Sequence, residues 1–157
     1  MDNERQQIRD RSFAWLNVTQ FLGALNDNIY KLLITIFLIK VSGKENAGAV
    51  VAIAGAVFVI PFLLFSHAGG VLADWFSKRT IIVATKALEV FVMLMGLAAF
   101  FLGSPPLLYV TLFLMAMQSA LFGPSKYGII PEVVDRSDLS RANSLIVAFT
   151  FLAIIIG

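Results

Sequence analysis

Four long apolar stretches, and the beginning of a fifth, dominate this sequence and limit what it can fold into. A helix needs about 17–25 mostly apolar residues to cross the ~30 Å hydrocarbon core of a bilayer, and the first four stretches have at least that length. The sequence therefore predicts an all-α membrane protein. The stretches run approximately over residues 13–40, 47–73, 80–102, 106–122 and 144–157.

The composition supports this class and excludes several others. Hydrophobic residues make up 59% of the chain and charged residues only 14%, against roughly 45–50% and about 25% in soluble domains. A net charge of +2 is too small to indicate a nucleic-acid partner. With no cysteine and one histidine, the sequence predicts no disulfide, no metal site and no cofactor.

The chain ends inside the fifth stretch. Its 14 residues would span about 21 Å as a helix, which is too short to cross. We therefore expect a fragment of a longer protein, holding transmembrane helices 1–4 and the start of helix 5. Residues 1–12 are polar and of mixed charge, which indicates a cytoplasmic N-terminus and not a signal peptide.

The basic residues predict how the chain crosses the membrane. Nine of them lie before the first stretch or around alternate loops, and two lie on the opposite side. Because lysine and arginine concentrate in cytoplasmic loops, the N-terminus is predicted to be cytoplasmic. The nine are Arg5, Arg9, Arg11, Lys78, Arg79, Lys86, Lys126, Arg136 and Arg141, and the two are Lys40 and Lys44.

Two charged residues, Asp27 and Lys31, lie near the middle of the first stretch. An ionised side chain at that depth costs at least about 2.5–3.5 kcal/mol, so both are expected to face protein or a water-filled cavity. Polar residues recur around them at intervals of three and four, which places them on one helical face, here called the polar stripe. The stripe is Asn17, Gln20, Ala24, Asp27, Lys31 and Thr35.

A polar stripe in a membrane helix is typical of a solute pathway. The alternative is that Asp27 and Lys31 form a local ion pair that only joins this helix to a neighbour. The predicted pathway residues are Asn17, Gln20, Asn26, Asp27, Asn28 and Lys31.

Three further polar residues are candidates with open alternatives. Glu89 lies three residues after Lys86, so it is either a pathway carboxylate or half of a packing contact. Gln118 either reaches the cavity or bonds to another helix. Lys126 follows the fourth stretch and is the third candidate.

The segment GGVLADWFSKR, residues 69–79, joins the second and third stretches. Its glycines let helices approach closely, and Asp74 is expected where the next helix begins. The segment resembles the signature loop of the major facilitator superfamily, in which it is a cytoplasmic latch between two halves. The resemblance rests on Gly70, Asp74, Lys78 and Arg79, and departs at Trp75, usually basic, and Ser77, usually glycine.

Three more segments narrow the resemblance to the lysophospholipid transporters of that superfamily. They are QFLGALNDNIYK (20–31), FGPSKYGIIPEVV (122–134) and LSRANSL (139–145). The arginine that many proton-coupled relatives carry in the fourth helix is absent, which argues against proton coupling.

The resemblance implies a major facilitator fold of twelve helices in two halves, with residues 13–157 in the N-terminal transmembrane half and substrate bound between the halves. It also implies inward movement of lysophospholipid, chiefly lysophosphatidylethanolamine, across a bacterial cytoplasmic membrane. An acyltransferase/acyl-carrier-protein ligase would then re-acylate the lipid. Asp27 would meet the ammonium of the headgroup, and Lys31 with Asn26 or Asn28 the phosphate.

Three alternatives remain. The first is another facilitator, such as an exporter of amphipathic drugs or metabolites. The second is the transporter part of a fused acyltransferase, with the enzyme beyond residue 157. A membrane scaffold is the third, and it would not require charges at the bilayer midplane.

Overall fold

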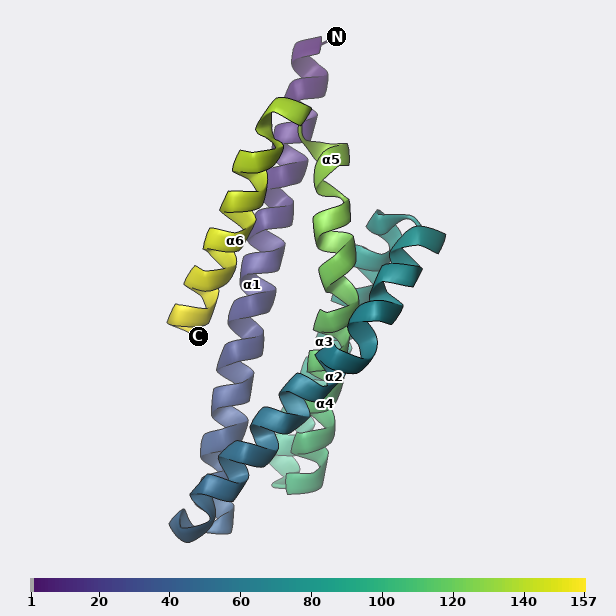
Figure 1. The fold of residues 1–157 in the computed structure, drawn as a ribbon. Helices are drawn as coiled ribbons and strands as arrows, with labels where there is room; N and C mark the ends of the chain where they lie inside the picture. Colours follow the sequence, from purple (N-terminus) through teal and green to yellow (C-terminus); the bar gives the residue numbers. More distant parts are fainter. Residues whose placement is uncertain (1) are drawn as a thin grey trace. The chain divides into compact units, whose positions relative to one another are not determined.

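The computed structural model describes residues 2–157, which form helices and short connections with no strand among them (Figure 1). Five stretches of the described chain are long and apolar enough to cross a membrane. The predicted all-α membrane class is therefore confirmed. The elements are α1 (Asp2–Ser42), the 3-10 turn η1 (Lys44–Asn46), α2 (Ala47–Trp75), α3 (Lys78–Leu102), α4 (Pro105–Gly128), α5 (Ile130–Val133), the 3-10 turn η2 (Arg136–Asp138) and α6 (Leu139–Ile156).

Helices α1 and α4 extend well beyond their apolar stretches. Helix α1 begins at Asp2, well before the first apolar residues, because a polar segment continues the same helix. Helix α4 runs on through Pro124 to Gly128, so the Gly-Pro-Ser-Lys segment is helical and not a loop. Proline is tolerated in membrane helices, where neighbouring helices compensate for the missing backbone bond.

The fifth helix is longer than its apolar residues indicate. Helix α6 begins at Leu139, five residues before Ser144, and has 18 residues. At ~1.5 Å per residue that is about 27 Å, and the stretch Arg136–Ile156 qualifies as a candidate span. The helix thus begins earlier than its apolar residues indicate, because its polar first turn carries no hydropathy signal.

The chain divides into two compact units. We call Ile29–Ser125 the continuous unit and the combination of Met1–Asn28 with Lys126–Gly157 the split unit. Both units use parts of α1 and α4, since the boundaries fall inside these helices.

The core of the continuous unit is built from one face of each of its four helices. From α1 it takes residues spaced four apart, which share a helical face. This face packs with small or branched residues of α2 and α3 and with α4. The buried core residues are Tyr30, Ile34, Leu38, Val50, Ala54, Val92, Ala99, Leu108, Leu112 and Met115.

A tight turn makes α3 and α4 antiparallel neighbours. Gly103 closes α3 with φ 58°, a left-handed conformation that favours glycine. Its N–H donates to the carbonyl of Phe100, and the N–H of Ser104 donates to that of Ala99. Pro105 then opens α4, where a missing N–H has no cost.

Two glycines allow close contacts between helices of this unit. A Cβ on Gly96 of α3 would collide with the ring and hydroxyl of Tyr30 on α1. A Cβ on Gly69 of α2 would lie 3.1 Å from the backbone of Ala120 and Leu121 on α4. Gly70, by contrast, has no described atom within 4 Å of an added Cβ. The close approach of α2 to α4 therefore occurs at Gly69.

In the split unit, α6 packs along the first part of α1 (Figure 1). The rings of Phe21 and Phe149 meet edge to face with centroids 6.0 Å apart. At the end of α6, a Cβ on Gly157 would lie 2.9 Å from the carbonyl oxygen of Leu25. This packing brings polar residues of α1 against α6.

Candidate functional site

A buried amide, Gln20 of α1, is the centre of the polar contacts in the split unit. Its side chain is only 2% exposed. Its Oε1 accepts a hydrogen bond of 2.8 Å from the hydroxyl of Thr150 on α6. Its Nε2 donates to the carbonyl of Ile146 at 3.3 Å and lies 3.5 Å from Oδ1 of Asn17. We call Asn17, Gln20, Lys126 and Thr150 the amide cluster.

Lys126 joins the cluster from the last turn of α4. Its Nζ lies 3.5 Å from Oε1 of Gln20 and 4.8 Å from the ring centroid of Tyr127. The helical extension of α4 through Pro124 places this ammonium beside α1. Three predicted site residues, Asn17, Gln20 and Lys126, are thus brought together.

Sequence reasoning missed Thr150. A single threonine in an apolar helix is unremarkable, since its hydroxyl commonly bonds to a carbonyl of its own helix. Thr150 does bond to the carbonyl of Ile146 at 2.7 Å, and in addition it reaches Gln20. The local sequence signal for its role is that Thr150 lies four residues after Ile146, about one helical turn, and the carbonyl of Ile146 accepts a bond from Gln20.

An apolar cavity of about 560 Å³ adjoins the amide cluster. Ligand sites in proteins commonly have volumes of about 300–1,000 Å³. Its lining includes one residue of the cluster, Asn17, which is also buried. The cavity and cluster together offer an apolar surface beside amides and an ammonium. The lining residues are Phe13, Ala14, Asn17, Val18, Phe21, Leu22 and Phe149.

Asp27 is buried as predicted, with 7% of its surface exposed. Its neighbours Asn26 and Asn28 are half-buried, and Nδ2 of Asn28 donates to the carbonyl of Ala24 at 2.8 Å. That bond holds the Asn28 amide against its own helix.

Lys31 belongs to the continuous unit. It is half-buried, and its Nζ lies 4.7 Å from the centroid of the Phe58 ring on α2. Its carbonyl accepts a 2.8 Å bond from the hydroxyl of Thr35, the last member of the polar stripe. An ammonium over an aromatic face is stabilised electrostatically, so Phe58 gives this side chain a favourable partner inside the unit.

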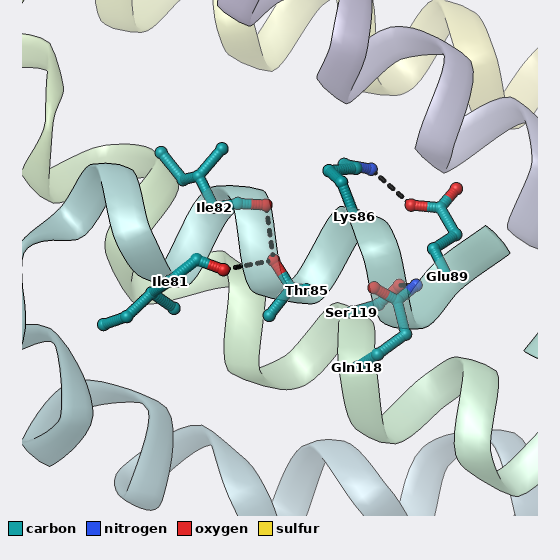
Figure 2. A network of polar contacts seen from close by, with 7 residues as sticks. All are labelled: Ile81, Ile82, Thr85, Lys86, Glu89, Gln118 and Ser119. Atoms are coloured by element: carbon teal, nitrogen blue, oxygen red, sulfur yellow. Dashed lines mark hydrogen bonds and ion pairs between the residues drawn. The ribbon is translucent and has the colours of Figure 1, made fainter. Parts of the chain in front are cut away.

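Figure 2 shows a second polar group, on α3 and α4 of the continuous unit. Nζ of Lys86 and Oε2 of Glu89 form an ion pair of 2.6 Å, with side chains 21% and 12% exposed. Lys86 also lies 4.6 Å from the centroid of the Phe122 ring. Gln118 donates to the hydroxyl oxygen of Ser119 at 2.9 Å.

The predicted latch lies around the short connection of α2 and α3. Asp74 is exposed in the last turn of α2, not at the start of α3. The cap of α3 is Ser77, whose side chain accepts from the N–H of Thr80 at 3.2 Å. Lys78 opens α3 half-buried, and Arg79 follows it exposed. Serine at the usual glycine position therefore has a structural reason, because it caps the helix.

A family model described as transmembrane secretion effector, within the major facilitator superfamily, matches residues 6–154. The lysophospholipid transporter LplT of Escherichia coli O1:K1 is 34% identical over 140 residues, which cover 89% of this chain and 33% of the relative. The transporters of that name in Escherichia coli strain K12 and in Shigella boydii serotype 18 give the same figures. The chain thus spans about a third of the length of these curated relatives. No solved structure matches the chain significantly.

Proposed function

The chain belongs to the major facilitator superfamily, and from that membership we propose that the protein moves lysophospholipid across a bacterial inner membrane. Lysophosphatidylethanolamine is the proposed substrate, and re-acylation in the inner leaflet is its proposed fate. The relatives named lysophospholipid transporters support the substrate class.

The observation that carries this proposal is the amide cluster beside its apolar cavity. A lysophospholipid has one acyl chain and a zwitterionic head, so it needs an apolar and a polar surface side by side. The cavity of about 560 Å³ offers the first, and Asn17, Gln20 and Lys126 offer the second. Within this site the ammonium of Lys126 is suited to a phosphate, since charge-assisted bonds are the stronger ones.

We assign Asp27 and Lys31 of the polar stripe, with the neighbouring Asn26 and Asn28, to the headgroup pathway. Asp27 takes the ammonium of the headgroup, and Lys31 with Asn26 or Asn28 takes the phosphate. The burial of Asp27 and the half-burial of Lys31 support a role inside the protein rather than in lipid contact.

Three further assignments complete the proposal. The N-terminus is cytoplasmic, as the basic loops indicate. Gly70, Asp74, Lys78 and Arg79 form a latch toward the other half of the transporter. An acyltransferase/acyl-carrier-protein ligase, separate or fused, consumes the delivered lipid.

The test is uptake of radiolabelled lysophosphatidylethanolamine by cells that express the protein or its Asp27→Asn variant. The variant keeps the shape of the side chain and removes its charge, so uptake should fall about tenfold or more, because a lost charge-assisted bond is worth roughly 1.5–3 kcal/mol. Ser66→Ala is the matched control. That serine is exposed, its hydroxyl bonds to the Phe62 carbonyl of its own helix and to no other described residue, and uptake should be unchanged. Well-expressed protein without uptake would refute the lipid assignment.

A second function is export of an amphipathic molecule, which the description of the family model as a secretion effector favours. The same cells distinguish the two. Export predicts loss of a preloaded fluorescent amphiphile, with no accumulation of lysophospholipid.

A further inference from the structure

The ion pair of Lys86 and Glu89 lies at membrane depth and is unused by the function proposed so far. By helical rise, Glu89 lies about 16 Å from the start of α3 at Lys78. Both side chains are mostly but not fully enclosed, at 21% and 12% exposure. The pair is therefore within reach of a small polar group.

An amide without a full set of partners lies at the same level. The Oε1 atom of Gln118 has no hydrogen-bond partner among the described residues, and its residue is 1% exposed. Its Nε2 donates to Ser119, which fixes the orientation of the amide. Buried acceptors almost always have a donor, so one without a donor indicates a missing partner.

The packing of α3 against α4 sets Gln118 level with Glu89. At one end, Gly96 and Thr111 both contact the hydroxyl of Tyr30. At the other end, Lys86 lies over Phe122. Glu89 comes seven residues before Gly96, and Gln118 comes seven residues after Thr111. Seven residues are two turns, about 10.5 Å, in each antiparallel helix, so the two residues fall between the same pair of contacts.

The chemistry of this group selects a zwitterion as ligand. A cation that binds Glu89 alone would leave the charge of Lys86 without its carboxylate partner. An anion that binds Lys86 alone would leave the charge of Glu89 without its ammonium partner, and an uncompensated charge inside the protein is costly. A ligand with both charges replaces both partners at once. Its ammonium has three donors, enough for Glu89 and for the acceptor of Gln118.

Resting on the proposed function, we propose that Lys86, Glu89 and Gln118 form a headgroup subsite that selects zwitterionic lysolipids. Glu89 and Gln118 bind the ammonium of an ethanolamine headgroup, and Lys86 binds its phosphate. The ion pair seen in the structure holds the site closed when no headgroup is bound. The subsite is separate in sequence from the polar stripe, so one headgroup occupies it and the position at Asp27 in turn and not at the same time.

The test compares two lysolipids that differ only in the headgroup: lysophosphatidylethanolamine, which has an ammonium, and lysophosphatidylglycerol, which has none. Glu89→Gln should lower uptake of the ethanolamine lipid about tenfold and that of the glycerol lipid less than twofold. Gln118→Met leaves the ion pair intact and should lower the preference for ethanolamine about threefold. This second variant keeps the test decisive if Glu89→Gln does not fold.

A charge swap, Lys86→Glu with Glu89→Lys, separates binding from folding. The swap rebuilds an ion pair on the same turn but exchanges the positions of the ammonium and the carboxylate. The subsite predicts normal expression without recovery of the ethanolamine preference. Equal loss for both lipids in Glu89→Gln, with full recovery in the swap, would show a structural pair and overturn the proposal.

A binding measurement on the purified protein makes the outcome independent of transport. Soluble glycerophosphoethanolamine should raise the melting temperature of the protein, glycerophosphoglycerol should raise it less, and Glu89→Gln should abolish the difference. If the protein takes up no lysolipid, the proposed function fails, and this measurement still decides the subsite. Equal effects of both compounds on the unaltered protein would overturn it.

Discussion

Tyr30 and Gln20 are both polar residues buried on α1, yet their surroundings differ. Tyr30, in the continuous unit, makes one side-chain bond, 2.7 Å to the hydroxyl of Thr111, which also bonds to carbonyls of its own helix. Its ring packs edge to face on Phe100 within an apolar core. Gln20, in the split unit, contacts side chains and backbone from α4 and α6 and adjoins a cavity through Asn17.

This difference teaches how to separate structural from functional polar groups in a membrane helix. Two polar side chains that bond to each other inside a packed apolar core hold helices together, and they have no free donor or acceptor for a ligand. An amide shared among several elements beside a cavity can exchange its partners with a solute. The following predictions test that distinction, from the largest expected effect to the smallest.

Gly96→Ala should have the largest effect on stability. The added Cβ would occupy the position of the Tyr30 hydroxyl, so α1 and α3 must separate or the bond to Thr111 must break. Overpacking of this kind together with a lost bond costs about 2–3 kcal/mol, measurable as the free energy of unfolding in mixed micelles. Gly55→Ala is the control, because nothing described lies within 4 Å of its added Cβ. It should leave stability unchanged or raise it by up to about 1 kcal/mol. Equal effects of the two would contradict the close packing at Gly96.

Gln20→Leu should lower both stability and uptake. The change keeps approximately the side-chain volume and removes the acceptor for Thr150 and the donor to the Ile146 carbonyl. We expect a loss of about 1–2 kcal/mol in unfolding free energy and of at least tenfold in lysolipid uptake. If uptake falls only in proportion to the amount of folded protein, the amide cluster has a structural role like that of Tyr30 and no role in transport.

Tyr30→Phe should cost stability alone. It removes the hydroxyl and keeps the ring, and Thr111 retains its bonds to Leu107 and Leu108. The expected loss is about 1 kcal/mol, with uptake per folded molecule unchanged. A changed substrate preference would contradict the distinction between Tyr30 and Gln20, since it would show that Tyr30 and Thr111 take part in substrate recognition.

The smallest effect concerns the pairing of Gln20 with Thr150. Thr150→Val alone should cost roughly 0.5 kcal/mol, because it removes the hydroxyl and its neutral bonds to Gln20 and to the Ile146 carbonyl of its own helix. In a double-mutant cycle with Gln20→Leu, the coupling energy should be about 0.5–1 kcal/mol. A coupling near zero would show that the 2.8 Å contact contributes nothing to folding.

Local patterns in the sequence predicted the helices well and their ends less well. Hydropathy located each apolar stretch, but the polar first turn of α6 and the segment around Pro124 lay outside it. The position of Ser77 as the cap of α3 was likewise missed, because Asp74 was expected at that point. Helix ends depend on capping and on neighbouring backbone, which hydropathy does not record.

The candidate site was predictable only in part. The spacing of Asn17 and Gln20 on one face indicated a shared surface, and both are buried there. Thr150 was not predicted, and Lys126 was placed in a loop when it lies in the last turn of α4. These partners are more than 100 residues away from Gln20 in sequence, and no spacing along one helix reveals them.

The sequence by itself determined the membrane class and the helices, because burial in lipid imposes length and hydropathy on each segment separately. Its motifs indicated the family. Only the tertiary structure decided which polar residues meet. It joined Gln20 to Thr150, placed the Tyr30 hydroxyl against Gly96, and set Gln118 level with Glu89. Those pairings arise from how helix faces pack, and packing depends on the shapes of side chains from distant segments rather than on any local pattern.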